Sequence, residues 1–297
     1  MFDFRYHVAS LAAIFFALVI GILVGVALAS HGLGNTERDR LQEDIRRAEN
    51  RGDAFKAQVD ALTQAGASDK AFVERAYKLV MANRLKGKKI AVVFVGSTDA
   101  NLTSVKTALS DAGAGDPIRV RALAVPIEQA KLQRRLANRP FLAAFAGPKQ
   151  LEQLGHALGQ EFAAGGDTPL WNALQNLIVE EKAGRSKRPA DGVVVVRTTA
   201  SQTGATAIFL KGLYAGIGDA GVPAVGAEGT DDAGSAMKAF QKAGVSTVDD
   251  IDTRAGKLAL VTLLSDALIR GDFGVKKTAH DGPLPNVGPV ATTTTGG

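Results

Sequence analysis

The feature that most constrains this chain is an uncharged apolar run near its beginning, Val8–Ala29, with the sequence VASLAAIFFALVIGILVGVALA. As a helix, its 22 residues would reach roughly 33 Å at about 1.5 Å per residue. That length matches the hydrocarbon core of a bilayer, which is about 30 Å thick. The apolar part of a cleaved signal peptide is usually shorter, about 7–15 residues. Although LASHG weakly resembles a cleavage site, the length favours a retained membrane anchor over residues 1–30.

Small residues recur at every fourth position of this run and include a GxxxG motif. Small side chains let two helix backbones approach closely in lipid, where van der Waals packing drives association. Alanine and glycine are common in membrane helices, so part of the alignment can arise by chance. The full register favours a contact between two copies of the helix. The stripe consists of Ala9, Ala13, Ala17, Gly21, Gly25 and Ala29.

A second signal for self-association follows the glycine-containing joint SHGLGNT. Over residues 35–66, apolar or small residues recur at alternating steps of four and three, and charged residues flank them. This spacing predicts a short parallel coiled coil, which would support the same two-fold pairing as the membrane helix. The run is near the lower length limit for a coiled coil, so an amphipathic helix packed on its own domain is the alternative. The seam consists of Leu41, Ile45, Ala48, Gly52, Phe55, Val59 and Leu62.

The rest of the chain alternates between strand and helix patterns. We expect Gly66-Ala67-Ser68 to end the first helix, with Ser68 capping the next one. KKIAVVFVG and ADGVVVVRTTA are typical of strands buried on both faces, and PIRVRALAV, VPAVGAEG and VSTVDDID predict further strands. The intervening stretches, including all of residues 139–184, read as helices. The pattern predicts a mainly parallel, Rossmann-like α/β domain over residues 69–275 and a disordered tail at 281–297.

Composition weakens several classes of function. The net charge is +5, but aromatic residues make up only 6% and do not interleave with the basic clusters, so binding to nucleic acid has little support. Affinity for an anionic lipid or wall polymer fits the same charge. The chain has no cysteine, which excludes disulfides, thiolate catalysis and cysteine-bound metals.

The loop VGSTDANLTSV, after the first buried strand, is a candidate ligand site. Ligands bind at the carboxyl ends of strands in open α/β sheets, and Ser97, Thr98 and the following helix amides suit an anion. The loop lacks the glycine spacing of dinucleotide-binding and P-loop motifs, so an ordinary strand-to-helix turn is the simpler interpretation.

Acidic loops and histidines offer little further chemistry. Glu228, Asp231 and Asp232 lie in a glycine-rich loop whose carboxylates suit a hard cation, but the spacing is not that of an EF-hand. No pair of histidines has ligand spacing, His156 is expected to be an exposed helix residue, and soft ligands for copper are scarce. No GxSxG motif is present, so we expect no catalytic residue, metal site or cofactor. The acids expected to cap the final helix are Asp249, Asp250 and Asp252.

Three segments resemble the actinobacterial MctB/SteB family. The opening FDFRYHVASLAAIFFALVIGILVG resembles the N-terminal signature of that family, and ADGVVVVRTT and STVDDIDTRAGKLALV resemble later parts of it. The opening is quite specific and the later segments are less so. Together they extend the resemblance over most of the chain.

The resemblance implies one of two roles. The MctB name implies copper transport across the mycobacterial outer membrane by a pore. The SteB name implies an envelope protein that pairs through a coiled coil, works with the membrane partner SteA and controls a peptidoglycan hydrolase during cell separation. An outer-membrane pore should be a β-barrel of roughly 10-residue alternating strands, whereas these strands are short and mixed with helices. The sequence therefore favours a homodimeric, non-enzymatic scaffold, with copper transport as the alternative.

Charge and resemblance disagree about the side of the membrane on which the domain lies. The excess of basic residues after the apolar run would place the domain in the cytoplasm by the positive-inside rule. The resemblance implies the opposite side. We expect a single-pass plasma-membrane protein with an extracytoplasmic domain, and the outer membrane is the alternative location. The basic residues are Arg5 before the run and Arg38, Arg40, Arg46 and Arg47 after it.

Overall fold

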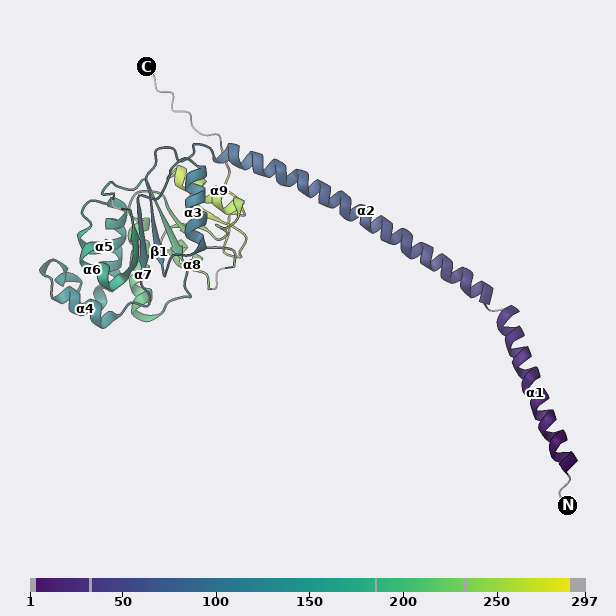
Figure 1. Cartoon of the computed structure of the whole chain (residues 1–297). Helices are drawn as coiled ribbons and strands as arrows, with labels where there is room; N and C mark the ends of the chain where they lie inside the picture. Colours follow the sequence, from purple (N-terminus) through teal and green to yellow (C-terminus); the bar gives the residue numbers. More distant parts are fainter. Residues whose placement is uncertain (1–3, 32–33, 185, 232–233, 289–297) are drawn as a thin grey trace. The chain divides into compact units, whose positions relative to one another are not determined.

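A computed structural model describes residues 4–31, 34–184, 186–231 and 234–288 of the chain. It divides into two units, residues 1–73 and 74–297. The first unit contains helix α1 (Phe4–His31) and most of helix α2 (Gly34–Met81). The second unit is an α/β domain in which helices flank a central sheet (Figure 1).

Helix α1 contains the apolar run. Val8–Ala29 is the one helical segment among the described residues that is long and apolar enough to cross a membrane. None of that segment is buried within the chain. The expected apolar helix is therefore present, and its side chains from Val8 to Ala29 are exposed.

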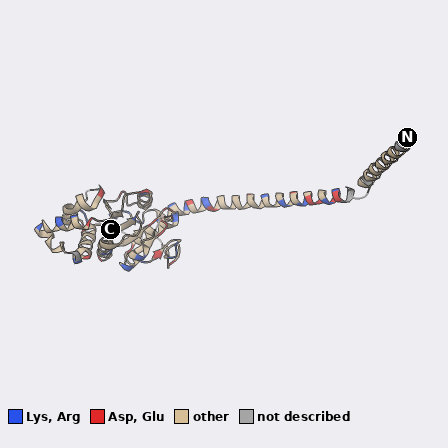
Figure 2. Ribbon diagram, turned by 90° about the horizontal axis from the view of Figure 1, so that it is seen from below, with Lys and Arg blue, Asp and Glu red and all other residues tan. Residues whose placement is uncertain are grey.

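Helix α2 is continuous over 48 residues, so the expected break at Gly66-Ala67-Ser68 is wrong. A single glycine costs about 1 kcal/mol in a helix interior, and strong helix formers on both sides propagate the helix through it. The predicted boundary between residues 66 and 69 thus falls inside one helix. Charges of both signs alternate along α2, as Figure 2 shows.

The last turns of α2 belong to the α/β unit. Met81 is fully buried in its core. Glu74 lies 2.6 Å from the Arg254 guanidinium, and the Tyr77 hydroxyl donates to Asp111 at 3.1 Å. These contacts within the second unit fix the end of the helix.

The sheet has seven strands in the order β3-β2-β1-β4-β5-β6-β7. All neighbouring pairs are parallel except β2 and β3, which confirms a mainly parallel, Rossmann-like sheet. The order places β1 between β2 and β4, so the carboxyl end of β1 is a topological switch point. The strands are β1 (Ile90–Val95), β2 (Arg119–Leu123), β3 (Val179–Ala183), β4 (Gly192–Arg197), β5 (Ala224–Ala227), β6 (Ser246–Val248) and β7 (Asp272–Phe273).

Two strands differ from the sequence expectation. β3 has the sequence VEEKA, lies within the stretch read as helical, and pairs antiparallel with β2 at the sheet edge. Its side chains are mostly exposed, so no hydrophobic run marks it as a strand. β7 contains only two residues, which is too short for any periodicity.

Alternate strand residues build two cores. Val93 and Val193 face one layer, while Val92 and Val194 face the other, because successive strand side chains point to opposite faces. Helices α3 (Ala100–Asp111) and α9 (Arg254–Ser265) cover the second layer with the end of α2. The first layer contains α4 (Gln129–Ala137), α5 (Leu151–Ala164), α6 (Pro169–Ile178), α7 (Gly204–Gly218), α8 (Met237–Lys242) and residues of the short 3-10 helix η1 (Pro140–Phe145). A second 3-10 helix, η2 (Pro148–Gln150), directly precedes α5.

Helices α5 and α7 pack through glycines on both sides. Gly155 and Gly159 in α5 lie against the α7 backbone, and Gly212 and Gly216 in α7 lie against the α5 backbone. A Cβ at any of these four positions would overlap main-chain atoms of the facing helix. Each helix thus carries a four-residue glycine spacing that permits a close crossing.

Part of the predicted tail also belongs to this domain. Gly282 accepts a hydrogen bond from the Gly274 amide at 3.0 Å, and Asp281 accepts one from the Asp272 amide at 2.8 Å. The Gly288 carbonyl accepts one from Arg84 at 2.8 Å. The expectation of disorder is therefore wrong for residues 281–288, and the remainder of the predicted tail, residues 289–297, lies outside the described residues.

Candidate functional site

The small-residue stripe of α1 has open space around it. Gly21 and Gly25 have nothing within 4 Å of the position that a Cβ would occupy. Large apolar side chains such as Phe16 and Leu28 are also exposed. This exposed surface with its small residues is suited to close packing by a second helix in lipid. The remaining described stripe residues are Ala9, Ala13, Ala17 and Ala29.

The seam of α2 is exposed in the same way. Its large members are between 48% (Ile45) and 68% (Phe55) exposed in the single chain, with Leu41, Val59 and Leu62 between these limits. Ala48 is also exposed, and Gly52 has open space around it. Because the helix continues past Gly66, the same spacing reaches Val73, although Asp69 interrupts the apolar pattern.

The Ser97–Thr98 loop lies at the topological switch point between β1 and α3, where the sequence predicted it. The Ser97 hydroxyl donates to Glu180 at 2.9 Å, and the Thr98 hydroxyl donates to Glu181 at 2.7 Å. Both acceptors belong to β3, which the sequence reading missed. The hydroxyls thus hold the edge strand against the loop, and an anion at this point would meet two carboxylates. Binding of an anion by these residues stays a prediction.

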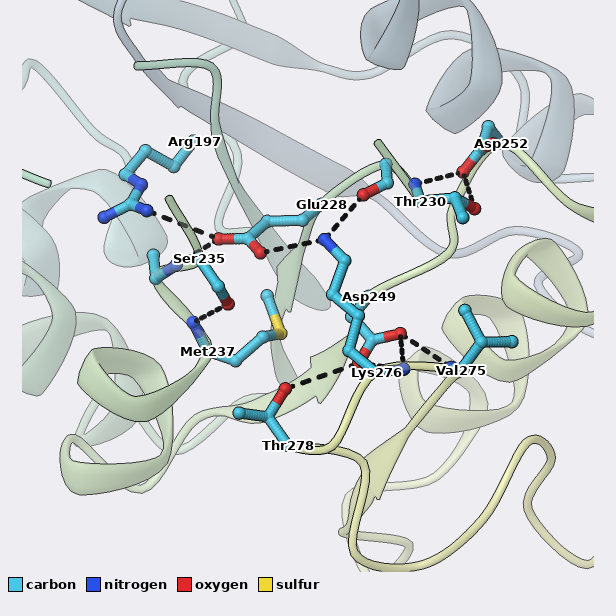
Figure 3. Close-up of polar contacts among 12 residues, drawn as sticks. Arg197, Glu228, Thr230, Ser235, Met237, Asp249, Asp252, Val275, Lys276 and Thr278 are labelled. Carbon is cyan, nitrogen blue, oxygen red and sulfur yellow. Dashed lines mark hydrogen bonds and ion pairs between the residues drawn. The ribbon is translucent and has the colours of Figure 1, made fainter. Parts of the chain in front are cut away.

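A buried charge cluster lies at the carboxyl ends of β4 and β5 (Figure 3). Arg197, the last residue of β4, is 7% exposed, and Glu228, directly after β5, is 1% exposed. Arg197 Nη2 lies 3.7 Å from Glu228 Oε1, and Lys276 Nζ lies 3.5 Å from Glu228 Oε2. The Ala236 amide also donates to Glu228, and Lys276 donates to the Gly229 carbonyl at 2.8 Å. Two cations therefore share one buried carboxylate.

Asp249, directly after β6, ties down the segment that follows β7. Its carboxylate accepts hydrogen bonds from the Val275 amide at 2.8 Å and from the Lys276 amide at 3.2 Å. The Thr278 hydroxyl donates to the same group at 3.4 Å. The segment thus brought in carries the Lys276 side chain to Glu228.

These contacts correct the expectation that the acids before the last helix cap it. Thr253 is the N-cap of α9, because its hydroxyl oxygen accepts from the Gly256 amide at 2.9 Å. Asp250 supports this cap indirectly, because its carboxylate accepts a hydrogen bond from the Thr253 hydroxyl at 2.8 Å. Asp252 accepts from the amide and the hydroxyl of Thr230 at 2.7 and 2.9 Å, and so holds the loop after β5. The acids therefore join neighbouring loops.

No described set of three or more His, Cys, Asp or Glu side chains is arranged to hold a metal ion. In the loop considered for a cation, Glu228 is engaged by Arg197 and Lys276, Asp231 is exposed, and Asp232 lies outside the described residues. The loop thus contributes one carboxylate to a protein ion-pair cluster.

His156 lies in a helix, α5, as the sequence predicted, and its side chain is 36% exposed. Its Nε2 lies 3.0 Å from the Asp219 carboxylate. This pair joins α5 to the end of α7, on the helix pair that the glycines bring together.

The sequence reading missed Arg197 and Lys276. Arg197 had a usable signal, since a charge that directly ends the buried run VVVV requires a counter-charge, and Glu228 ends the neighbouring strand. Lys276 had none, because it lies outside any periodic segment and reaches the site through the Asp249 contacts.

The family of the chain is shown by a match to a family model. A family model described as "Copper transport outer membrane protein, MctB" matches residues 1–283. No curated protein matches the chain. The matched residues include the apolar helix, the long helix and nearly all of the described α/β domain.

Proposed function

We propose that this chain, which belongs to the MctB family of envelope proteins, is a non-enzymatic scaffold that pairs with a second copy through α1 and α2. α1 anchors it as a single-pass protein of the plasma membrane. α2 provides the coiled coil, and the α/β domain contacts other envelope proteins. This role differs from the family description, which names copper transport and the outer membrane.

The observation that carries the pairing is the exposed seam of α2. Burying a large aliphatic or aromatic side chain is worth about 1.5–3 kcal/mol, and five such side chains lie exposed along the seam. A second copy offers an identical seam in register, and charges of both signs flank it, as in two-stranded coiled coils. The open Gly21 and Gly25 positions of α1 support the same two-fold arrangement.

The pairing test exploits the absence of native cysteine. A single Ala48→Cys variant of the full chain, expressed in membranes, should give crosslinked dimer in high yield. Adding Ile45→Asp should lower the yield strongly, because it places a charge in the seam of both chains. Gly21→Ile with Gly25→Ile should lower it further. Ala57→Asp is the matched control, since it adds the same charge on the outward face of α2. Crosslinking that all these variants retain would contradict the pairing.

We place the α/β domain outside the cytoplasm, where it works with a SteA-like membrane partner and a peptidoglycan hydrolase. The support is the resemblance of the opening and later segments to the family. A Lys106→Cys variant, with the cysteine on the exposed surface of α3, tests the location. A membrane-impermeant maleimide should label it in intact cells as well as in lysed cells. Protection until lysis would put the domain in the cytoplasm and remove the cell-wall role.

The second candidate is copper transport, which the family description favours. It requires copper ligands that the described side chains do not gather in one place. Copper binding by the purified full chain at micromolar affinity would favour this candidate over the scaffold. Copper sensitivity of a deletion strain without such binding would instead fit an indirect effect of envelope assembly.

A further inference from the structure

A pocket of about 490 Å³ lies between α7 and α8, beside the buried charge cluster. Its volume falls within the range of small-molecule sites, about 300–1,000 Å³. Ala207 and Leu210 from α7 and Ala239 from α8 line part of it. The pocket is therefore wide enough for an organic molecule and has apolar surface to receive it.

Arg197 lines this pocket with unused hydrogen-bonding capacity. Its guanidinium is nine-tenths buried, and among the described residues it makes no hydrogen bond. Its contact with Glu228, at 3.7 Å, is an ion pair too long for a hydrogen bond (Figure 3). A buried guanidinium without hydrogen bonds lowers the stability of the fold, and a bound acceptor would remove this cost.

Tyr214 presents a second free donor to the same pocket. The side chain is 3% exposed, and its ring packs edge-on against Phe240 with centroids 4.7 Å apart. No hydrogen bond of its hydroxyl occurs within the described part of the chain, although the residue lines the pocket. Burial raises the pKa of the Tyr214 hydroxyl, so it stays protonated and able to donate.

The charged side chains among the described lining residues of the pocket are all basic. Lys211, Lys238 and Lys242 line it together with Arg197, and no carboxylate is among its described lining residues. Lys211 is paired with Glu152 at 2.9 Å. Lys238 and Lys242 make no ion pair with any described residue and are exposed, so their charge is available to a ligand.

We propose that this pocket binds a small organic phosphate, whose oxygens accept hydrogen bonds from Arg197 and Tyr214. The guanidinium fork matches the geometry of a phosphate, and the additional lysines favour a multiply charged anion over a single carboxylate. The apolar wall formed by α7 and α8 holds the organic part. Neither the pairing through α1 and α2 nor a copper role requires this site. The phosphate-binding proposal is therefore tested independently of both.

The test is equilibrium dialysis of the full chain in a phosphate-free non-ionic detergent. The probes are pyrophosphate, glycerol 1-phosphate and succinate, with glycerophosphoglycerol as the soluble headgroup of a phospholipid. Saturable binding of the phosphates, weakened by added salt and exceeding that of succinate, is expected. Stronger binding of the headgroup probe than of pyrophosphate would identify a lipid as the source of the phosphate.

Variants assign the binding to this pocket. Tyr214→Phe keeps the ring and removes one donor, so it should weaken binding about fivefold. Lys238→Ala with Lys242→Ala should weaken binding several fold and reduce its dependence on salt. Lys106→Ala, an exposed lysine on α3, is the matched control and should leave binding unchanged. Thermal unfolding confirms that each variant is folded. Absence of saturable binding at millimolar concentration, equal binding of succinate, or equal weakening by Lys106→Ala would overturn the proposal.

Discussion

At the scale of single residues, the carboxyl edge of the sheet depends on a few buried carboxylates. Glu228 balances two cations, and Asp249 binds the segment that supplies one of them. Asp250 holds the hydroxyl that caps α9. Glu228 and Asp249 each follow directly after a strand, and Asp250 is the next residue, so strand ends and the loops beyond them are fixed together. Folding at this edge therefore depends on charge and hydrogen bonding more than on apolar packing.

We predict that Glu228→Gln strongly destabilises the domain. The variant leaves Arg197 and Lys276 without their shared counter-charge in a buried position, and breaking a buried pair in this way costs about 3 kcal/mol or more. Urea unfolding of the full chain in detergent measures the change. Glu128→Gln is the control, because its pair with Lys131 is exposed and is worth less than about 1 kcal/mol. Equal losses in the two variants would contradict the role of burial.

We also predict that Asp250 makes stability fall as the pH rises. Burial raises the pKa of this carboxyl, and the nearby Asp249 and Asp252 raise it further. The folded state therefore holds the proton more tightly than the unfolded state, whose pKa is about 3.9. The stabilisation from protonated Asp250 is fully present below the unfolded-state pKa. It is lost as the pH rises through the folded-state pKa. Asp250→Asn should remove this part of the slope when the free energy of unfolding is measured between acid and neutral pH.

At the scale of elements, the buried strands were predictable and the edges were not. IAVVFV and GVVVVR are runs that only a strand buried on both faces explains, and both formed as expected. VEEKA consists mainly of helix formers, and pairing with β2 overrides that preference. The predicted break of α2 at Gly66 is wrong, because the helix formers on both sides of this glycine outweigh its cost in a helix interior. The buried charge cluster was not predicted, because Arg197 and Glu228 come together only through the order of the strands in the sheet.

Glycine stabilises the packing of α7 but weakens helix α2, and a pair of glycine-to-alanine variants tests this difference. Gly212→Ala in α7 should destabilise the domain by about 1–3 kcal/mol, since the new Cβ overlaps the backbone of Glu152. Gly66→Ala in α2 meets open space and should stabilise its helix by up to about 1 kcal/mol. Thermal unfolding followed by circular dichroism compares the two. Shifts of the same sign would show that packing between α5 and α7 does not decide the outcome.

At the scale of the whole molecule, the apolar helix and the α/β domain were predicted from the sequence, whereas α2 was predicted as two helices and is one. The domain extends beyond its predicted end at residue 275, since Lys276, Thr278 and Gly288 make the contacts with Asp249, Glu228 and Arg84. No pattern in KKTAHDGPLPNVG indicates these contacts, because they depend on backbone groups, one lysine and one threonine. The family match likewise extends to residue 283.

A truncation series follows from this extent. Ending the chain after Arg270 removes β7, the partners of Asp249 and the Lys276 side chain, so Asp249 loses the donors described above and Glu228 loses one of its two cations. The truncated protein should be unstable or fail to accumulate. Ending it after Gly288 keeps every described contact and should leave the unfolding temperature unchanged. A stable, folded protein ending at Arg270 would contradict the structural role given to this segment.

The glycines between α5 and α7 also have an evolutionary consequence. Each of the four positions faces main-chain atoms, and no substitution in the opposite helix can move those atoms away. A larger side chain at Gly155 or Gly212 therefore has no compensating partner mutation. Among related chains these positions should stay fixed instead of covarying, while neighbouring side chains drift in pairs. Two glycine pairs, each with a spacing of four residues and one in each of the helices α5 and α7, would then identify distant relatives. Such relatives would be recognisable even where the membrane and coiled-coil segments have diverged.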